Sequence, residues 1–390
     1  MQTQVIPYLR ELVKGGHELT LLTFEPGEVD EGAVRELLKA DGIEWHWLKY
    51  HKRPSVPATM FDIANGARFI RRLAAEKKFD ILHCRSHVPT MMAAIARKGI
   101  KERPKLLFDI RGFFPEEYVD AGVWPEGGAI YRNVKRAEAW LMKEADGFVV
   151  LTEAARDILV NGIGDRPVEV IPCCVDLNRF EAANEETRRV SREALSIGDR
   201  FAIAYVGALG GWYLTDETAA FFRAAKQQRP DTFALVLTQS DPAMIEPLLS
   251  DAGFAPGERF VGKVSASEIP KYLSAADTAV SFIKNCFSKK ASSPTKNAEY
   301  LACGLPIVAN LGVGDTDKQL TEDRTGVLVD KFEKSALARA VVETLELLED
   351  GDLAERCRKS SRERFDLGTV GGERYRRLYS NIIGENIASS

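Results

Sequence analysis

The chain has 390 residues, of which 45% are hydrophobic and 28% are charged, and its net charge is −4. This length allows two domains, and the composition is that of an ordinary globular protein. The small negative charge argues against a general nucleic-acid-binding surface, and no apolar run approaches the roughly 18 residues needed to cross a bilayer. We therefore expect a globular protein that does not bind nucleic acid.

Six cysteines and five histidines are scattered along the chain. Only Cys173 and Cys174 are adjacent, and none of these residues shows the spacing of a metal site. Reduced, buried thiols are the simplest interpretation, which together with the lack of a recognisable signal peptide predicts a cytoplasmic protein. We expect no metal and no cofactor.

The N-terminal half alternates between helices and strands. Residues 5–13 place their apolar side chains on one helical face, and "HELTLLTFEP" follows as a strand. Further strands are predicted at "EWHWLKY", "DILHCR", "KLLFDIRG", "GFVVLT" and "VEVIPC", with helices over residues 61–77, 89–98 and 130–144. Continuous apolar strands separated by amphipathic helices predict a parallel sheet that is covered on both faces. A doubly wound domain normally opens with a strand, and that first strand is lacking here.

The composition of the sequence changes after residue 175. Residues 176–199 are polar and contain no predicted strand, which indicates a linker. A second alternating region follows over residues 200–370, with strands such as "FAIAYVG" and "PIVAN", and residues 371–390 are predicted to form a C-terminal helix that returns towards the N-terminal domain. The fold class is therefore α/β, with two doubly wound Rossmann-like domains that face each other across a cleft. Ligands are expected at the carboxyl ends of the strands.

The stretch "SSPTKNAEYLACG" carries the strongest chemical signal. Ser293 suits an N-cap and Pro294 suits the first helical position, so the amides of Thr295, Lys296 and Asn297 are predicted to point out of the helix start. These amides, the helix dipole and the ammonium of Lys296 suit a diphosphate. Glu299, about one turn further on, suits the hydroxyl groups of a ribose. A plain capped helix is the alternative interpretation.

A second signal is "AIAYVGALGGWYLTDE", in which a buried strand runs into Gly207, Gly210 and Gly211 before a helix begins. Glycines at these places allow a backbone to approach a phosphate, although a tight turn explains them equally well. The strand in "FDIRGFFPEEY" ends in Asp109 and Arg111, followed by Glu116 and Glu117. Polar groups in that position suit acceptor binding or proton transfer, and a structural Asp–Arg pair is the alternative.

Other candidates are weaker. Arg85 and His87 follow the preceding strand and are candidates for the acceptor side, although a lone histidine beside a proline is more often structural. Asp315 and Asp317 in "GDTDK" lack a third ligand and are interpreted as a solvated turn. The basic stretch "RFIRRLAAEKK" suits either anionic lipid or a solvated helix face, and peripheral membrane contact is thus a further expectation.

At this point the motifs resemble the group 1, or family 4, retaining glycosyltransferases with the GT-B fold. "SPTKNAEYLACGLPIVAN" is similar to the donor-site signature of one bacterial branch, and "FDIRGFFPEE", "YVGALGGWY", "FVGKVSASEIPKYLSAAD" and "VIPCCVDLNRF" follow that branch in order and spacing. The resemblance covers nearly the whole chain. It implies the transfer of a sugar from a nucleotide sugar, of UDP or GDP type, with retention and without a bound metal.

The resemblance also assigns roles to residues. Glu299 matches the second glutamate of the family's Glu-x7-Glu element and would hold the ribose, while Thr295 and Lys296 would meet the diphosphate. Val264 lies where the family's backbone contacts the base. Asp109 falls where many relatives keep a histidine near the sugar, so Asp109, Arg111 and Lys296 are the candidates for catalysis.

Two departures from the family pattern concern the donor site. Ala291 stands where the first glutamate of that element would fall, and the loop after Gly207 lacks the arginine and lysine that relatives carry there. Lys289, Lys290 or Lys296 must then balance the diphosphate. The expected function is a retaining hexosyltransferase that acts on a glycan or a lipid-linked acceptor in surface polysaccharide or glycolipid synthesis. The alternatives are a non-catalytic GT-B module or partner subunit and, less favoured, a nucleotide-sugar epimerase.

Overall fold

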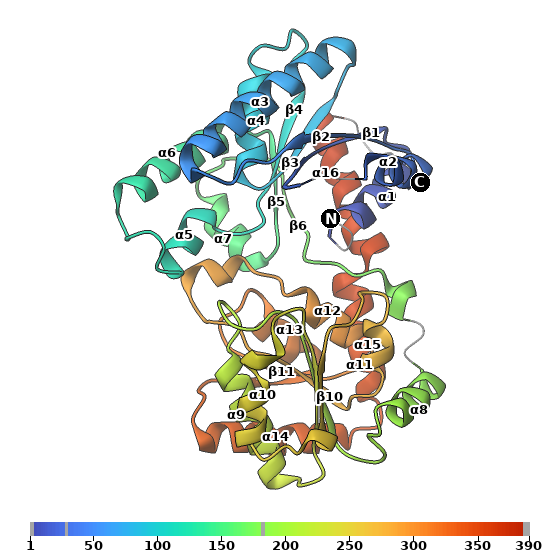
Figure 1. The fold of residues 1–390 in the computed structure, drawn as a ribbon. Helices are drawn as coiled ribbons and strands as arrows, with labels where there is room; N and C mark the ends of the chain where they lie inside the picture. The colour runs from blue at the N-terminus through green and yellow to red at the C-terminus, as the bar shows by residue number, and fades with distance from the viewer. Residues whose placement is uncertain (1–3, 28–29, 181–183, 385–390) are drawn as a thin grey trace. The chain divides into compact units, whose positions relative to one another are not determined.

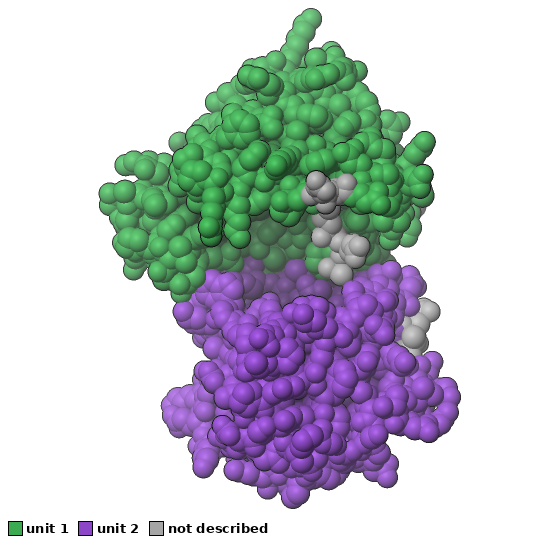
Figure 2. Space-filling model, viewed as in Figure 1, with its two compact units in different colours: residues 1–172, 367–390 green, residues 173–366 purple. Residues whose placement is uncertain are grey.

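The alternating strands and helices form parallel sheets in each of two units of the chain. The computed structural model describes residues 4–27, 30–180 and 184–384 (Figure 1). Unit 1 comprises residues 1–172 and 367–390, and unit 2 comprises residues 173–366 (Figure 2). The α/β class predicted from the sequence is confirmed.

Unit 2 contains one six-stranded sheet in the order β12-β11-β10-β7-β8-β9, and every strand pair in it is parallel. All residues of its central strands are buried, because helices cover both faces and two large apolar clusters form on either side. The strands are β7 (Ala202–Val206), β8 (Phe233–Leu237), β9 (Arg259–Gly262), β10 (Thr278–Ser281), β11 (Ile307–Asn310) and β12 (Gly326–Val329). The α-helices are α8 (Glu185–Ala194), α9 (Thr215–Gln228), α10 (Glu246–Asp251), α11 (Ile269–Leu273), α12 (Thr295–Ala302), α13 (Thr316–Asp323), α14 (Lys334–Leu348) and α15 (Leu353–Phe365). Short 3₁₀ turns are η1 (Leu177–Phe180), η2 (Pro242–Met244), η3 (Pro256–Glu258) and η4 (Phe287–Ala291).

Unit 1 contains two parallel sheets, of four strands in the order β3-β4-β5-β6 and of two strands, β1 and β2. The strands are β1 (Leu19–Glu25), β2 (Ile43–Lys49), β3 (Ile81–Arg85), β4 (Lys105–Asp109), β5 (Gly147–Val150) and β6 (Val168–Val170). The helices are α1 (Ile6–Lys14), α2 (Glu31–Ala40), α3 (Ser55–Glu76), α4 (His87–Arg97), α5 (Phe114–Asp120), α6 (Ala129–Glu144), α7 (Glu153–Val160), the π-turn η5 (Leu367–Gly372) and α16 (Glu373–Ile383). Within the described residues, β1 and β2 precede α3 and form the small sheet, whereas β3 to β6 follow α3 and form the larger one.

The C-terminal helix α16 connects these two sheets. The ring of Tyr379 lies 5.2 Å from His17, just before β1, and 5.9 Å from His83 in β3. Tyr375 lies 5.7 Å from Tyr8 in α1 and 5.2 Å from His83. Aromatic rings from the two ends of the chain thus supply the packing that holds the small sheet next to the larger one.

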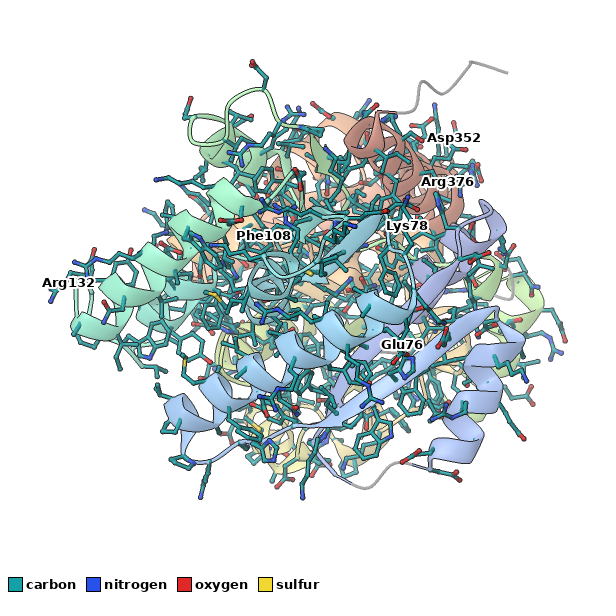
Figure 3. All side chains as sticks on the ribbon, turned by 90° about the horizontal axis from the view of Figure 1, so that it is seen from above. Glu76, Lys78, Phe108, Arg132, Asp352 and Arg376 are labelled. Atoms are coloured by element: carbon teal, nitrogen blue, oxygen red, sulfur yellow. The ribbon has the colours of Figure 1, made fainter. Side chains whose placement is uncertain are left out.

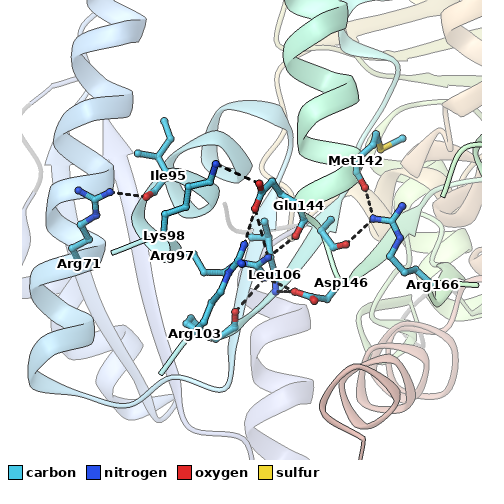
Figure 4. Close-up of polar contacts among 12 residues, drawn as sticks. Arg71, Ile95, Arg97, Lys98, Arg103, Leu106, Met142, Glu144, Asp146 and Arg166 are labelled. Carbon is cyan, nitrogen blue, oxygen red and sulfur yellow. Dashed lines mark hydrogen bonds and ion pairs between the residues drawn. The ribbon is translucent and has the colours of Figure 1, made fainter. Parts of the chain in front are cut away.

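A buried arginine joins α4 and α6 to the start of β4 (Figure 4). Arg97 donates to the carbonyl oxygen of Glu144 at 2.6 Å and also contacts the carboxylate of Asp146. That carboxylate accepts the amide of Leu106 at 2.8 Å. The ends of two helices and one strand are therefore fixed by one charge-assisted network, and the same helix α4 anchors Arg71 of α3 through the carbonyl of Ile95.

The stretch predicted as a linker is partly helical. Within residues 176–199 the structure places η1 and α8, and α8 belongs to unit 2. Arg188 forms an ion pair with Asp277 at 2.5 Å, and Arg192 donates to the carbonyl oxygen of Ala275 at 2.7 Å. These arginines hold α8 against the segment between α11 and β10, which the polar sequence of this stretch did not indicate.

Candidate functional site: the carboxyl ends of β7 and β10

The strand order of unit 2 creates a switch point between β7 and β10. In chain order its strands read 3-2-1-4-5-6, so the connections leaving β7 and β10 turn to opposite sides of the sheet. Doubly wound sheets bind their ligands at the carboxyl ends of the two strands that flank such a point. The segments that leave β7 and β10 begin at Gly207 and Phe282, and they contain the two motifs singled out from the sequence.

The loop after β7 has positive φ angles that favour glycine. Gly207, Gly210 and Gly211 have φ values of +138°, +75° and +62°, which a residue with a Cβ atom adopts only with strain. The amide of Gly210 donates to the hydroxyl of Thr215 at 2.8 Å, and Tyr213 forms a β-bridge with Ile283 after β10. The loop is thereby held against both strands of the switch point.

Helix α12 begins one residue later than predicted. Pro294, rather than Ser293, is the N-cap, and the Ser293 hydroxyl accepts the amide of Cys173 at 3.1 Å. The amide of Asn297 bonds to the carbonyl of Pro294, so Thr295 and Lys296 are left as the amides at the helix start. The prediction of Ser293 as a cap was wrong because a residue 120 positions away in the sequence takes its hydroxyl.

Tyr300 fixes α12 to the switch point. Its side chain is fully buried, and its hydroxyl accepts the amide of Val206 at 2.7 Å and donates to the carbonyl of Val280 at 3.3 Å. These two residues belong to β7 and β10. The start of α12 is thus locked to the same two strands that carry the glycine loop, which brings the two sequence motifs together.

Lys296 lies beneath the glycine loop. Its ammonium lies 4.3 Å from the centroid of the Tyr205 ring and 4.6 Å from that of Tyr213, and a Cβ atom on Gly207 would stand 3.6 Å from Nζ. The residue is 7% exposed, and among the described residues Nζ has no hydrogen-bond partner. Burial lowers the pKa of Lys296 to about 7, although Glu299 opposes that shift.

Two more lysines gather around the same loop through Trp212. The ammonium of Lys289 lies 4.0 Å from the Trp212 ring centroid, and that of Lys284 lies 5.8 Å from it. The backbone amide of Lys284 also donates to the Trp212 carbonyl at 2.8 Å. The loop that lacks cationic residues of its own therefore supplies aromatic rings to which lysines from after β10 and from α12 are drawn.

Glu299 is buried near these cations, and it is 7% exposed. Burial raises the pKa of its carboxyl to about 7, and Arg179 and Lys296 act against that shift. Ala291, at the place of the family's other glutamate, is also buried and contributes no polar atom to the site. A buried carboxylate whose negative charge is only partly balanced by neighbouring cations is typical of a site that binds a polar ligand.

Val264 follows β9 at the same edge of the sheet. Its backbone carbonyl accepts the amide of Gln239 at 2.9 Å, and Gln239 lies just after β8. The sequence predicts a backbone contact between Val264 and a base, and it indicates no side chain that would fix this position. The structure adds Gln239 as the side chain that fixes this position.

Unit 1 has a polar cluster of its own around Asp109 at the end of β4. The carboxylate is fully buried and lies 3.6 Å from Arg111, 3.7 Å from Arg85 and 3.5 Å from His83. It also accepts the hydroxyl of Tyr375 at 2.9 Å. Burial favours a raised pKa, but Arg111, His83 and Arg85 outweigh burial and hold the pKa of Asp109 well below its usual range.

The two other residues assigned to the acceptor side, His87 and Glu117, lie in different surroundings. His87 is buried between Phe108 and Phe114 and bonds to Glu138 at 3.0 Å, which is a structural role. These contacts favour the structural alternative for His87, because Glu138 from α6 holds the ring against the core of the unit. Glu117 is half-buried, and its carboxylate oxygen lies 3.1 Å from where a Cβ atom on Gly112 would stand.

The structure thus assembles two groups of predicted residues, one in each unit. In unit 2 it brings together Lys296, Glu299 and the glycine loop, and in unit 1 it joins Asp109, Arg111 and Arg85. Sequence reasoning missed the aromatic rings of the loop after β7, and it missed His83 and Tyr375. His83 had a readable signal, since it lies two residues before Arg85 and therefore on the same face of β3.

A cationic, amide-rich edge suits an anionic ligand such as a diphosphate. Within the described ranges, no three histidine, cysteine, aspartate or glutamate side chains cluster as metal ligands. No helix of that part of the chain is long and apolar enough to cross a bilayer. The strand order and the glycine loop, together with the buried Lys296, define unit 2 as a Rossmann-like domain of the nucleotide-binding class.

Comparison with known families and structures refines this class. The model of Glycosyltransferase Family 4 matches residues 1–179, and that of Glycosyl transferases group 1 matches residues 187–364. The two matches lie one in each half of the chain, and with the parallel α/β architecture of both units they are those of the GT-B fold.

Individual relatives are distant. The chain is 27% identical to the 2-deoxystreptamine glucosyltransferase of Streptomyces kanamyceticus over 55% of its length and 54% of that protein. It is also 27% identical to the D-inositol 3-phosphate glycosyltransferase of Paenarthrobacter aurescens strain TC1, over 65% of its length and 62% of that protein. The chain thus aligns with only a little over half of each of these curated relatives.

A solved structure with the same fold carries a nucleotide. Anabaena HepE in complex with UDP and glucose superposes with a TM-score of 0.69 at 16% identity, over 96% of this chain and 95% of that one. At this level of identity the likeness establishes the fold.

Proposed function

We propose that the chain transfers a sugar with retention from a nucleotide sugar of UDP or GDP type to a glycan or lipid-linked acceptor, without a metal ion. The reaction would serve the synthesis of a surface polysaccharide or glycolipid. It would take place in the cytoplasm, with peripheral contact at the inner face of the membrane. One observation carries the proposal: the buried ammonium of Lys296 lies between the glycine loop and the start of α12, at the switch point of unit 2.

The donor diphosphate would bind at this point. The amides of Thr295 and Lys296 and the positive end of the α12 dipole favour an anion, and Lys296 regains its proton when a negative phosphate arrives. Lys289, held on Trp212, adds charge from the segment after β10. Glu299 would accept the ribose hydroxyls, and the backbone at Val264 would meet the base.

Catalysis then requires little covalent participation by the protein. As the anomeric bond breaks, negative charge develops on the leaving diphosphate, and preorganised amides and ammonium groups stabilise it. The acceptor hydroxyl would approach from the face that the diphosphate leaves, and a phosphate oxygen would take its proton. Asp109 and Arg111 of unit 1 would position the reacting sugar and acceptor.

The experiment that tests this proposal is a donor panel. The purified chain is incubated with UDP- and GDP-sugars, with and without glycan and lipid-linked acceptors, and nucleotide release is measured. We expect release from one donor, unaffected by EDTA, and a product whose anomeric configuration, read by NMR, equals that of the donor. An inverted anomer or loss of activity in EDTA would refute the corresponding part of the mechanism.

A second candidate function is a non-catalytic nucleotide-binding module or partner subunit. It is favoured by Ala291, because the usual glutamate contact to the donor sugar has no counterpart there. Nucleotide binding without release from any donor would select this alternative. A product epimerised at a sugar carbon would instead select a nucleotide-sugar epimerase.

A further inference from the structure

Helix α3 of unit 1 exposes several large apolar side chains near its start. Val56, Met60 and Phe61 are 61%, 61% and 57% exposed, and Tyr50 in the preceding loop is 43% exposed. We call these four residues the α3 apolar patch. Val56 and Met60 are four residues apart and lie on one face of α3, Phe61 follows Met60, and the buried Ala58 and Asp62 lie on the opposite side of the helix.

Exposed apolar residues are common singly, but a group of this size on one helix face indicates a binding surface. The helix lies at the front of the molecule in the view of Figure 3, where it runs towards Glu76 at its end. No other described element is recorded as covering these side chains. The patch therefore needs a partner that accepts apolar groups.

The exposed charges next to the patch in the sequence are basic, although the half-buried Glu25 of β1 pairs in register with Lys49. Between residues 45 and 75 every exposed charged side chain is basic: Lys49, Lys52, Arg53, Arg68, Arg71 and Arg72. The one acid of this stretch, Asp62, is buried. Lys49, Lys52 and Arg53 lie before the start of α3 and Arg68 follows the patch on the same helix, so positive charge lies on both sides of Val56, Met60 and Phe61.

The patch is also held in place. The carboxylate of Asp62 accepts the amide of His51 at 2.9 Å and contacts the His51 ring nitrogen at 2.6 Å. The His51 ring in turn meets the Phe61 ring edge-on at 5.1 Å. Arg71 secures the later part of α3 to the carbonyl oxygens of Ile95 and Ala96 at the end of α4 (Figure 4).

We propose that the α3 apolar patch and its basic flanks dock unit 1 on an anionic lipid surface. Apolar side chains enter the headgroup region while lysines and arginines contact phosphate headgroups, which is how interfacial helices bind. The inference rests on the proposed function in that it names the surface at which a lipid-linked acceptor would be met. It assigns this contact to residues 49–72, whereas the sequence had pointed to the basic stretch 68–78.

The remaining basic residues of 68–78 are less available for lipid. Lys77 pairs with Glu44 and Lys78 lies 3.2 Å from Glu102, and Arg72 lies 3.6 Å from Glu76. Charge complementarity also disfavours a second copy of the chain as the occupant. A two-fold contact through this patch would bring the basic flanks of both copies together, and like charges repel.

Vesicle co-sedimentation tests the proposal on the full chain without nucleotide. We expect binding to vesicles of phosphatidylcholine with 30% phosphatidylglycerol, and little binding to pure phosphatidylcholine; that fraction is about what gives a bacterial-like surface charge. The triple variant Val56→Ser, Met60→Ser, Phe61→Ser is expected to bind at least about tenfold more weakly. The variant Lys52→Gln, Arg53→Gln, Arg68→Gln is expected to lose about as much affinity and most of the salt dependence.

Matched controls and a second readout keep the test decisive. Val342→Ser and Met244→Ser change residues of unit 2 that are 42% and 44% exposed, and they should bind like the wild type. Light scattering of each variant reports the oligomeric state. Unchanged vesicle binding by the triple serine variant, no binding by the wild type, or a wild-type dimer that this variant converts to a monomer would overturn the proposal.

The same preparations separate this inference from the proposed function. Nucleotide affinity is measured in the absence of vesicles, and the triple serine variant should match the wild type because its changes lie in unit 1. If vesicles bind but no nucleotide does, the proposed function fails and the docking surface stands. If nucleotide binds and the patch variants sediment as the wild type does, the docking surface fails alone.

Discussion

The ammonium of Lys296 lies 4.6 Å from the centroid of the Tyr213 ring, although 83 positions separate the two residues. Tyr213 belongs to the loop after β7, and Lys296 belongs to the first turn of α12. An aromatic face attracts a cation without neutralising it, so the charge remains available to a ligand. In the proposed donor site, aromatic rings of this loop therefore stand where the resembled family carries cationic side chains.

Replacing Lys296 by methionine should abolish donor binding and stabilise the ligand-free chain. The variant removes the ammonium proposed to meet the diphosphate, and we expect nucleotide affinity to fall at least about 100-fold, as for the loss of a charge-assisted contact. It also removes a cation that is desolvated in the folded chain, so the unfolding free energy at pH 7 should rise. Calorimetric titration and thermal unfolding measure the two effects, with the exposed Lys318→Met as the control. A methionine variant that is both less stable and still binds would contradict the assignment.

Nucleotide affinity should depend on pH through the same ammonium. With a pKa of about 7 in the ligand-free chain, Lys296 loses its proton as the pH rises above 7, so affinity for the diphosphate should fall by up to about tenfold per pH unit there. Binding near pH 8 should be accompanied by proton uptake, seen as a dependence of the calorimetric enthalpy on the buffer. The groups that face Nζ are the Tyr205 and Tyr213 rings and Glu299, whose carboxyl also has a pKa of about 7 and gains negative charge over the same range. Lys296→Arg should therefore keep only the part of the pH dependence that Glu299 contributes, and the double variant Lys296→Arg, Glu299→Gln should bind with a flat profile.

The pair Lys296 and Glu299 should also shape stability. The folded pKa of Glu299 lies above its unfolded value, so its contribution to stability is lost as the pH rises from about 4.5 to 7. The folded pKa of Lys296 lies below its unfolded value, so its contribution is lost as the pH falls from about 10.5 to 7. Relative to the double variant Lys296→Met, Glu299→Gln, the wild type should be least stable near pH 7. Urea unfolding between pH 5 and 9 checks this, and a difference that does not vary with pH would contradict it.

Much of the candidate site in unit 2 could be predicted because its sequence signals are local. Gly207 and Glu299 occur in short motifs in which the residue type dictates the backbone or the charge, and a strand followed by a glycine loop has few alternatives. The order of strands made these motifs neighbours, since parallel strands bring their carboxyl ends to one edge. The α/β class followed from the same alternation.

What could not be predicted depends on contacts between distant segments. Ser293 resembled a cap, but the Cys173 amide takes its hydroxyl. Tyr375 lies 266 positions from Asp109, and only the return of α16 to unit 1 places its hydroxyl on that carboxylate. Trp212 is an apolar residue in the sequence, and its role became visible only when Lys289 was seen over its ring.

The ring of Tyr213 should matter for function, and its hydroxyl should not. Tyr213→Phe keeps the π face near Lys296 and should bind nucleotide as the wild type does. Tyr213→Leu removes the face, and we expect a loss of about threefold to tenfold, since a cation–π contact contributes about 0.5–2 kcal/mol. The leucine variant should also shift the pH midpoint of binding. Equal losses in both variants would instead point to the hydroxyl and contradict the role of the ring.

The negative charge of Asp109 should be essential to the stability of unit 1. Asp109→Ala leaves Arg111 and Arg85 without the buried carboxylate, which costs about 3–5 kcal/mol of unfolding free energy. Tyr375→Phe removes one hydrogen bond and should cost about 1 kcal/mol, which makes it the milder probe. In Tyr375→Phe the release of sugar from the donor should slow while nucleotide affinity stays unchanged, because the nucleotide site lies in unit 2. A changed affinity with unchanged turnover would refute the role assigned to this cluster.

Glu299 offers the sharpest test of how the donor is held. If its carboxylate accepts the ribose hydroxyls, Glu299→Gln should weaken nucleotide binding about 10-fold to 100-fold, the range for a hydrogen bond to a charged group. The wild type should also bind the 2′-deoxy or 3′-deoxy nucleotide more weakly than the parent, while the glutamine variant should distinguish them far less. Such a loss of discrimination locates the contact at the ribose, which a general weakening of the fold does not. A variant that keeps the full preference for the parent nucleotide would remove Glu299 from the ribose and leave it as a partner of Lys296 alone.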